Sequence, residues 1–229
     1  FFVEELRSFQ KSKPEDLQKS TTPAQVIYLA AGLAEWDLHV QKSLSPETGE
    51  ALALMFTIQG NTGTWGSLDC WPPFESDAFH LATVAAQAAA TAPGWLGNLK
   101  DPAQLSAVAR LRQYLRETAS PHDYGRTLLL WAAARMPDLL PVARKSELIA
   151  MLRKRQQADG GWSLRKFSEP EKWGGGKRAT KLRNEPDFAT PLSDGHMTGL
   201  AIIALREAGV AASDSALRRG VQWLKSNQR

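Results

Sequence analysis

The stretch Gln157-Ala158-Asp159-Gly160-Gly161-Trp162 ends a charged, helix-forming run and turns the chain through two glycines to a tryptophan. An earlier segment, Gln59-Gly60-Asn61-Thr62-Gly63-Thr64-Trp65-Gly66, has the same order of glutamine, short polar turn, glycine and tryptophan. A third segment, Trp223-Leu224-Lys225-Ser226-Asn227-Gln228-Arg229, matches the run-up to another copy. We therefore predict that the protein is built from repeats of one unit.

Helix signals follow one another along the chain, and no stretch has a convincing strand pattern. Serine, threonine, aspartate or proline precedes most of the apolar periodic runs, as expected at helix starts. We expect about nine helices, over approximately residues 1–13, 22–40, 45–59, 78–92, 102–115, 122–136, 141–157, 194–209 and 214–228.

Two kinds of helix alternate in the second half of this series. One kind carries long charged side chains on one face, as in residues 102–115, 141–157 and 214–228. The other kind is rich in alanine and leucine, as in residues 78–92, 122–136 and 194–209. The simplest arrangement places the charged helices outside and the apolar helices inside. Helix pairs repeating in this way predict an α-solenoid or a closed α/α toroid.

Composition is that of an ordinary soluble globular protein, with 43% hydrophobic and 23% charged residues in a chain of 229. No apolar run reaches the roughly 20 residues that a transmembrane helix needs, and no signal peptide is visible. We expect a soluble protein whose cellular location the sequence leaves open. The single cysteine, Cys70, rules out an internal disulfide and a four-cysteine zinc site.

The positive charge is concentrated in one segment, residues 163–192, which we predict to be a long loop inserted into the repeat domain. Between Arg165 and Arg183 there are seven basic and two acidic residues, and the rest of the chain is close to neutral. No spacing of aromatic and basic residues suggests a nucleic-acid surface. Three interpretations stay open: a lid, a docking site for an acidic protein partner, or a solvated insertion.

At the two tryptophan turns the sequence resembles the QW motif of squalene–hopene cyclases and related terpene cyclases. Arg219-Gly220-Val221-Gln222-Trp223-Leu224 is similar to the lead-in of another copy, and Ser193-Asp194-Gly195-His196-Met197-Thr198-Gly199 is similar to an inner helix start. The closest resemblance is to a group of bacterial squalene-cyclase-like proteins. It implies an all-α fold of the α/α-toroid type over residues 1–229, either incomplete or part of a longer protein.

The resemblance implies a terpene-cyclase-like domain that binds a long apolar, isoprenoid-like ligand in a central cavity. The Asp-x-Asp-Asp segment with which such cyclases protonate squalene is absent, and so is the aspartate-rich magnesium motif. Asp194-Gly195-His196 is placed like the zinc motif of protein prenyltransferases, with histidine where the thiolate should be. Any enzymatic activity would be that of a cyclase-like isomerase or lyase, and no cofactor is specified.

In such a toroid the inner helices start around one mouth of the cavity, so polar residues at these starts are candidate site residues. The candidate acid–base groups are Asp77, His80, Asp194 and His196. The candidate ligand-binding residues are Trp71, Glu75, His122, Asp123 and Tyr124.

Each of these residues also has a structural interpretation. Asp77, Asp123 and Asp194 are well suited to cap helices, His80 fits a buried interior position, and His122 fits an exposed first turn. Alternatively, the histidines and carboxylates converge on a metal ion. Cys70 is either a buried thiol or a reactive one.

Two other functions remain open. The chain would be a non-catalytic structural or interaction domain of a larger assembly, or a carbohydrate-active α/α-barrel enzyme that uses Glu75 and Asp77.

Overall fold

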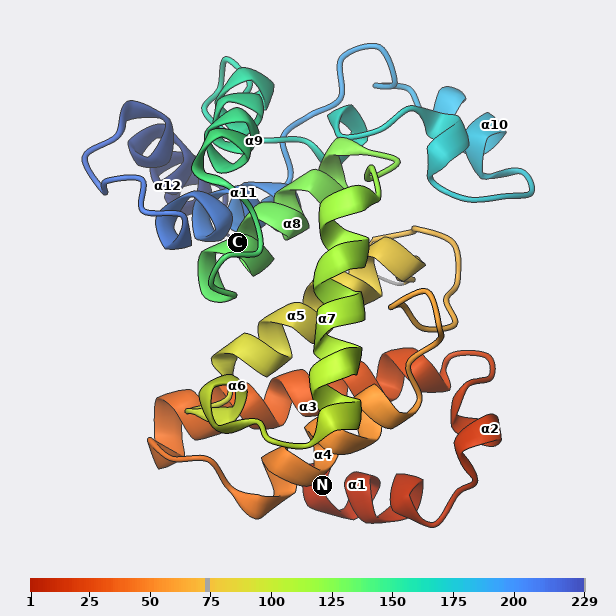
Figure 1. The fold of residues 1–229 in the computed structure, drawn as a ribbon. Coiled ribbons are helices and arrows are strands. Elements are labelled where there is room, and N and C mark those ends of the chain that lie inside the picture. The colour runs from red at the N-terminus through yellow and green to blue at the C-terminus, as the bar shows by residue number, and fades with distance from the viewer. Residues whose placement is uncertain (73–74, 229) are drawn as a thin grey trace. The chain divides into compact units, whose positions relative to one another are not determined.

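The computed structural model describes residues 1–72 and 75–228, and these residues form helices joined by turns (Figure 1). Within them the only β pairing is an isolated bridge between Trp71 and Glu75, so the all-α prediction is confirmed. The chain divides into an N-terminal unit, Phe1–Ala119 with Arg135–Leu139, and a C-terminal unit, Ser120–Ala134 with Leu140–Arg229. No helix in the described part is long and apolar enough to cross a membrane.

The N-terminal unit is built on two helix pairs. Its helices are α1 (Phe2–Gln10), α2 (Pro14–Leu17), α3 (Thr22–Trp36) with its π-helical extension η1 (Asp37–Gln41), α4 (Pro46–Thr57), α5 (Ala78–Thr91), α6 (Trp95–Asn98) and α7 (Pro102–Glu117). Helix α3 contacts α4 and α5, and α7 contacts the same two helices. The pair α5/α7 therefore covers the pair α3/α4, and α1 lies against α3 and α4.

The C-terminal unit contains the remaining helices. These are α8 (Asp123–Arg135), α9 (Val142–Arg155), the 3-10 turns η2 (Leu164–Lys166) and η3 (Pro170–Lys172), α10 (Arg178–Arg183), α11 (Gly195–Glu207) and α12 (Ser215–Asn227). Helix α11 contacts α12 and α9. The described part thus has twelve α-helices rather than about nine, because α2, α6 and α10 have only four to six residues and are too short to show a helical period.

The division into buried and charged helices is borne out by their burial. Helix α5 is buried along nearly its whole length, and its run of alanines lets other helices approach its backbone closely. Helix α7 buries only one stripe, made of Ala107, Val108, Leu111 and Leu115. In the C-terminal unit α9 buries only Leu148 and Leu152. The closed toroid itself remains a prediction.

Both tryptophan turns fold the indole back onto the helix that precedes them. Trp65 Nε1 donates to the carbonyl of Met55, and Trp162 Nε1 donates to the carbonyl of Leu152, each at 2.8 Å. Both carbonyls belong to the last four residues of their helix, where no further turn supplies a donor. Each buried indole therefore satisfies a carbonyl that the end of the helix leaves open.

A glutamine ties each turn to the next charged helix. Gln59 Nε2 donates to the carbonyls of Gly63 (3.1 Å) and Ala107 in α7 (3.2 Å). In the second turn Gln156, not Gln157, makes the equivalent bonds, to Gly160 (2.8 Å) and to Ala216 in α12 (2.7 Å). The predicted alignment of the two copies was therefore wrong by one residue at the glutamine.

The glycine two residues before each tryptophan, Gly63 or Gly160, is required by two constraints. Gly63 and Gly160 have φ of +87° and +94°, values that residues with a Cβ rarely adopt. A Cβ on Gly63 would also lie 2.5 Å from the carbonyl oxygen of Arg110 in α7. On Gly160 it would lie 3.0 Å from the carbonyl oxygen of Arg219 in α12. The turn and the following helix therefore approach as closely as glycine allows.

We predict that Gly63→Ala lowers the free energy of unfolding by about 2–4 kcal/mol, since it adds a backbone clash to a strained φ. Gly209→Ala is the matched control, because Gly209 has φ +89° and open space around its Cβ position. It should cost only about 1–2 kcal/mol. Urea unfolding measures both, and equal losses would contradict the proposed close approach.

Candidate functional site

The start of α5 collects several of the predicted polar residues. Asp77 Oδ1 accepts the backbone N–H of His80 at 2.7 Å, so Asp77 is the N-cap. The His80 ring is buried, and its Nε2 lies 3.1 Å from the hydroxyl of Tyr28. Tyr28 lies in α3 and its hydroxyl is also 3.1 Å from Ser76 Oγ. Sequence reasoning missed Tyr28 because it lies inside a helix, away from any helix start.

Cys70 lies beside this cluster as a buried thiol. Burial raises the pKa of Cys70 far above its ordinary value, and the neighbouring negative charge of Asp77 raises it further. Burial likewise raises the pKa of Tyr28. At neutral pH both groups are therefore protonated, which favours the structural interpretation of Cys70 over a reactive thiolate.

A pocket of about 280 Å³ opens next to Tyr28. Its polar lining includes Tyr28, Glu75 and Ser76, with Gln25 from the same helix as Tyr28. Glu75 exchanges backbone hydrogen bonds with Trp71, at 2.9 and 3.1 Å. Pro73, two residues after Trp71, is outside the described residues. This pocket is too small for a long apolar ligand and suits a small polar molecule.

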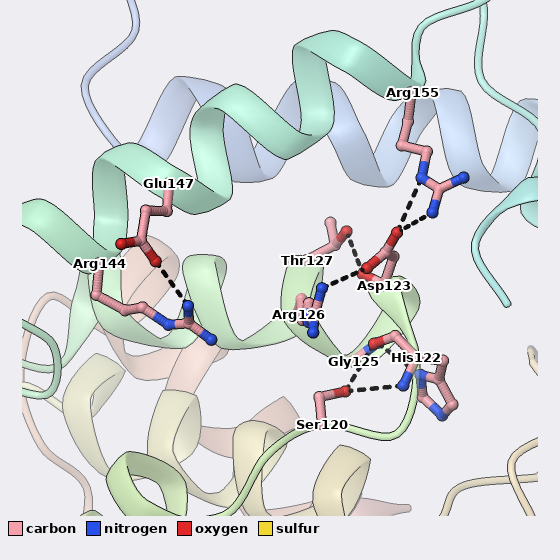
Figure 2. Close-up of polar contacts among 9 residues, drawn as sticks. All are labelled: Ser120, His122, Asp123, Gly125, Arg126, Thr127, Arg144, Glu147 and Arg155. Carbon is pink, nitrogen blue, oxygen red and sulfur yellow. Dashed lines mark hydrogen bonds and ion pairs between the residues drawn. The ribbon is translucent and has the colours of Figure 1, made fainter.

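The start of α8 differs from its prediction (Figure 2). His122 Nδ1 accepts the backbone N–H of Gly125 at 2.9 Å, so His122 rather than Asp123 caps this helix. A ring nitrogen that accepts a hydrogen bond carries no proton, and the neutral ring is therefore protonated at Nε2. The imidazole is buried, so the predicted exposed first-turn position is also wrong. Nothing in the pattern Ser120-Pro121-His122-Asp123 indicates that His122, rather than Asp123, caps the helix.

Asp123 is instead a buried carboxylate held by arginines. Its Oδ2 accepts from Nε of Arg155 at 2.8 Å and from Nη2 of the same guanidinium, and its Oδ1 accepts from Arg126 Nη1 at 3.0 Å. The backbone N–H of Asp123 donates to the carbonyl of Phe167 at 2.8 Å. Asp123 thus joins α8 to α9 and to the segment after the second tryptophan turn, which is a structural role.

Predicted residues His122, Tyr124 and His196 lie in one aromatic cluster, together with Trp173. The rings of His122 and Trp173 are stacked with centroids 5.3 Å apart. Tyr124 lies 6.0 Å from His122, 6.1 Å from Trp173 and 5.9 Å from His196. His196 alone among these side chains is exposed, so it is the member that a solvent molecule or ligand can reach.

The segment 163–192, which we name the basic segment, is not the solvated insertion that was one prediction for it. It contains η2, η3 and α10, and it buries apolar side chains of its own. Those buried side chains are Leu164, Phe167, Trp173 and Leu182. Arg165 binds Glu185 through two hydrogen bonds (2.8 and 3.0 Å), and Arg183 binds Glu171. A protein partner for its exposed lysines remains a prediction.

Asp194 caps α11 and also holds the basic segment. Its Oδ1 accepts the N–H of Met197 at 2.7 Å, and its Oδ2 accepts the N–H of Leu164 at 2.6 Å. Both oxygens therefore serve backbone groups. Asp77, Asp123 and Asp194 all have structural partners, and the candidate acid–base set is reduced to histidines beside tyrosines.

A separate apolar groove of about 640 Å³ lies between α1, the C-terminal half of α3 and η1. Its large side chains are Phe1, Phe2, Val3, Leu33, Trp36 and Val40. Trp36 is 56% exposed and Val40 54%, values high for residues of their kind. Gly32 leaves space in the α3 wall, since a Cβ there would meet only the Phe2 ring, at 3.7 Å.

Three carboxylates, and no lysine or arginine side chain, are among the residues that line this groove: Glu35, Asp37 and Glu47. Asp37 is buried and accepts from the N–H of Ser45 at 2.6 Å. Glu35 pairs with Arg135 and lies 3.1 Å from His39. Of the apolar residues Phe2, Val3, Leu6 and Phe9 of α1, only Leu6 and Phe9 are buried.

No protein-family model matches the chain, and no curated protein matches it. The resemblance to terpene cyclases therefore stays a prediction, and functional arguments start from the geometry above.

We predict that His122→Asn is more stable to unfolding than His122→Ala by about 1 kcal/mol. Both variants lose the ring that stacks on Trp173, but asparagine keeps an oxygen that can accept the Gly125 N–H. Thermal or urea unfolding of the two proteins measures the difference. Equal stability would show that the His122 ring is not needed as a cap.

We predict that iodoacetamide alkylates Cys70 in the folded protein at about pH 8 at least about tenfold more slowly than in the urea-unfolded chain. A raised pKa leaves little thiolate, and burial also denies access. Mass spectrometry follows the labelling. Rapid stoichiometric labelling of the folded chain would restore the reactive-thiol interpretation.

Proposed function

We propose that the chain is a helical-repeat domain of terpene-cyclase type that binds a long apolar, isoprenoid-like ligand in the groove between α1, α3 and η1. The observation that carries this proposal is the groove itself, whose volume of about 640 Å³ is within the usual range for small-molecule sites. Phenylalanine, tryptophan, valine and leucine side chains form most of its surface, and they match an unbranched or methyl-branched hydrocarbon in polarity.

Burial supplies a sufficient driving force for this binding. Fully covering a large apolar side chain stabilises a complex by roughly 1.5–3 kcal/mol. Phe2, Trp36 and Val40 are all about half exposed in the groove, so a ligand that covered the three would gain roughly half of their combined value. That gain is roughly 2–4.5 kcal/mol, so micromolar binding also requires burial of the ligand's own carbons, which contributes about 0.8 kcal/mol per CH₂ before the cost of association.

Repeated bonds at the two tryptophan turns support the terpene-cyclase-type part of the proposal. Trp65 and Trp162 bond to carbonyls ten residues earlier, and Gln59 and Gln156 bond to the next charged helix. The binding place differs from the expected central cavity. It lies toward the end of α3, whereas the predicted helix starts are engaged in caps and ion pairs.

An interaction domain is the second candidate, because another surface groove, of about 460 Å³ and lined by Ile202, Val221 and the basic Arg218, lies on α11 and α12. The carbohydrate hypothesis has less support, since Asp77, one of its two carboxylates, caps α5.

We predict that Gly32→Leu weakens binding of farnesol at least about tenfold, because the new side chain enters the groove against the Phe2 ring, which lies 3.7 Å from the Cβ position. The helical backbone at Gly32 accepts a side chain without strain, so the fold should persist. Isothermal titration calorimetry measures the affinity, and circular dichroism checks the fold.

Gly199→Leu is the matched control, since Gly199 is a helical glycine of α11 with open space at its Cβ position. It should bind farnesol as the unchanged chain does. Absence of saturable binding to the unchanged chain, or equal affinities for all three proteins, would refute the groove as the ligand site.

A further inference from the structure

The pocket of about 280 Å³ beside Tyr28, in the N-terminal unit, has no part in the proposed function. Its walls come from the start of α3 and the two residues before it, from the turn after Trp65, and from the residues that lead into α5. It shares no lining residue with the α1–α3–η1 groove. Its volume is at the lower limit of the roughly 300–1,000 Å³ usual for ligand sites, so a molecule that fills it must be small.

Close backbone contacts hold these walls together. The N–H of Leu68 donates to the carbonyl of Ser76 at 3.2 Å, and this bond joins the turn to the start of α5. A Cβ on Gly66 would lie 3.0 Å from the carbonyl oxygen of Gln18, so the turn also lies close to the segment before α3. The pocket is therefore bounded by three segments of one unit, and none of them is at an end of the chain.

Tyr28 and Ser76 form a fixed polar pair in the pocket wall. Ser76 is only 9% exposed, and its Oγ lies 3.1 Å from the Tyr28 hydroxyl. The same hydroxyl lies 3.1 Å from Nε2 of the buried His80, so both its position and its partners are set by the fold. A serine hydroxyl can donate one hydrogen bond and accept two. Ser76 can therefore bond to a ligand without losing Tyr28.

Four more polar side chains line the pocket: Ser20, Thr21, Gln25 and Ser67. All four residues are exposed, and within the described residues their side chains have no hydrogen-bond partner. Hydroxyl and amide groups both donate and accept hydrogen bonds. A matching ligand would therefore carry several groups that also do both, as hydroxyl groups do.

Charge and apolar surface narrow the ligand class further. Among the described residues that line the pocket, Glu75 is the only charged one. The pocket therefore offers no cationic side chain for a phosphate or carboxylate group. Tyr28 and Leu68 are 46% and 40% exposed, so the pocket also offers apolar surface to the C–H groups of a ligand.

We propose that this pocket binds a neutral polyhydroxylated molecule with the size of a single sugar ring. Ligand hydroxyl groups would bond to Ser76, Gln25 and Ser67, and the C–H face of the ligand would pack against Tyr28. The pocket would bind such a molecule without cleaving a glycosidic bond, because that reaction uses two carboxylates and Glu75 is the single carboxylate of the described lining.

Chemical shifts of the backbone amides in the isotope-labelled full chain test the proposal. The probes are D-glucose, D-galactose, D-mannose and myo-inositol, each titrated to about 50 mM because a small ligand held by neutral hydrogen bonds has a Kd in the millimolar range. We expect at least one probe to give saturable shifts that are largest at Ala24, Ser67 and Leu68. No saturable shift with any of the four probes, or shifts confined to residues outside the pocket, would overturn the proposal.

Two charged probes test the ligand class. The monophosphate ester of the sugar or inositol that binds should bind at least about tenfold more weakly, since the pocket has no cationic side chain and Glu75 repels the phosphate. Ethylammonium should show no saturable binding. If ethylammonium binds as tightly as the neutral probe, or if the phosphate ester binds more tightly, the pocket is an ion site and the proposal is wrong.

A pair of alanine substitutions identifies the binding groups. Gln25→Ala with Ser67→Ala removes two of the proposed hydrogen bonds and should weaken binding of the neutral probe at least about tenfold. Both residues are exposed, so the fold should persist, and circular dichroism checks it. Ser106→Ala with Gln113→Ala, at exposed positions of α7 outside the pocket, is the matched control and should bind as the unchanged chain does. Equal affinities for all three proteins would refute the pocket as the binding site.

Discussion

The bond from a tryptophan indole to a carbonyl in the last turn of the preceding helix is the interaction on which this fold depends. Trp65 and Trp162 each make it at 2.8 Å, and both indoles are buried. In each turn the glycine two residues before the tryptophan has a positive φ and lies against the backbone of the next charged helix. A glutamine amide then joins the two helices. One short turn therefore ends a helix and also sets the position of the helix pair that follows.

Helix termini explain where the polar residues of this chain are used. Every helix start has N–H groups without partners inside the helix. Asp77, His122 and Asp194 satisfy such groups at α5, α8 and α11, and Asp123 is neutralised by Arg155. These four residues, which the sequence offered as candidate site residues, are thus bonded to backbone N–H or guanidinium groups. What remains accessible is Tyr28 at its small pocket, with the buried His80 bonded behind it, and the exposed ring of His196.

Binding capacity is found instead on the exposed faces of helix pairs. In each unit a groove combines apolar and charged side chains. Between α1 and α3 the carboxylates Glu35 and Glu47 are paired with Arg135 and Arg7, whereas the charged side chains that line the groove between α11 and α12 are basic. Trp36 and Val40 would gain from any apolar cover, whether a hydrocarbon chain or another protein surface.

The sequence by itself determined the helical class, the alternation of charged and apolar helices, and the two tryptophan turns, because these depend on local periodicity, capping and glycine. Tertiary structure decided which glutamine joins the repeats, since Gln156 and Gln157 are adjacent and only the position of α12 distinguishes them. It also decided that the His122 ring caps α8, that Tyr28 joins His80, and that the basic segment is anchored by Trp173. The Tyr28–His80 and Trp173–His122 contacts join residues far apart in the sequence, and no periodic pattern predicts such contacts. The choices of Gln156 over Gln157 and of His122 over Asp123 are between adjacent residues that could both make the bond. Local pattern therefore predicted the elements, and only their packing assigned the partners of the side chains.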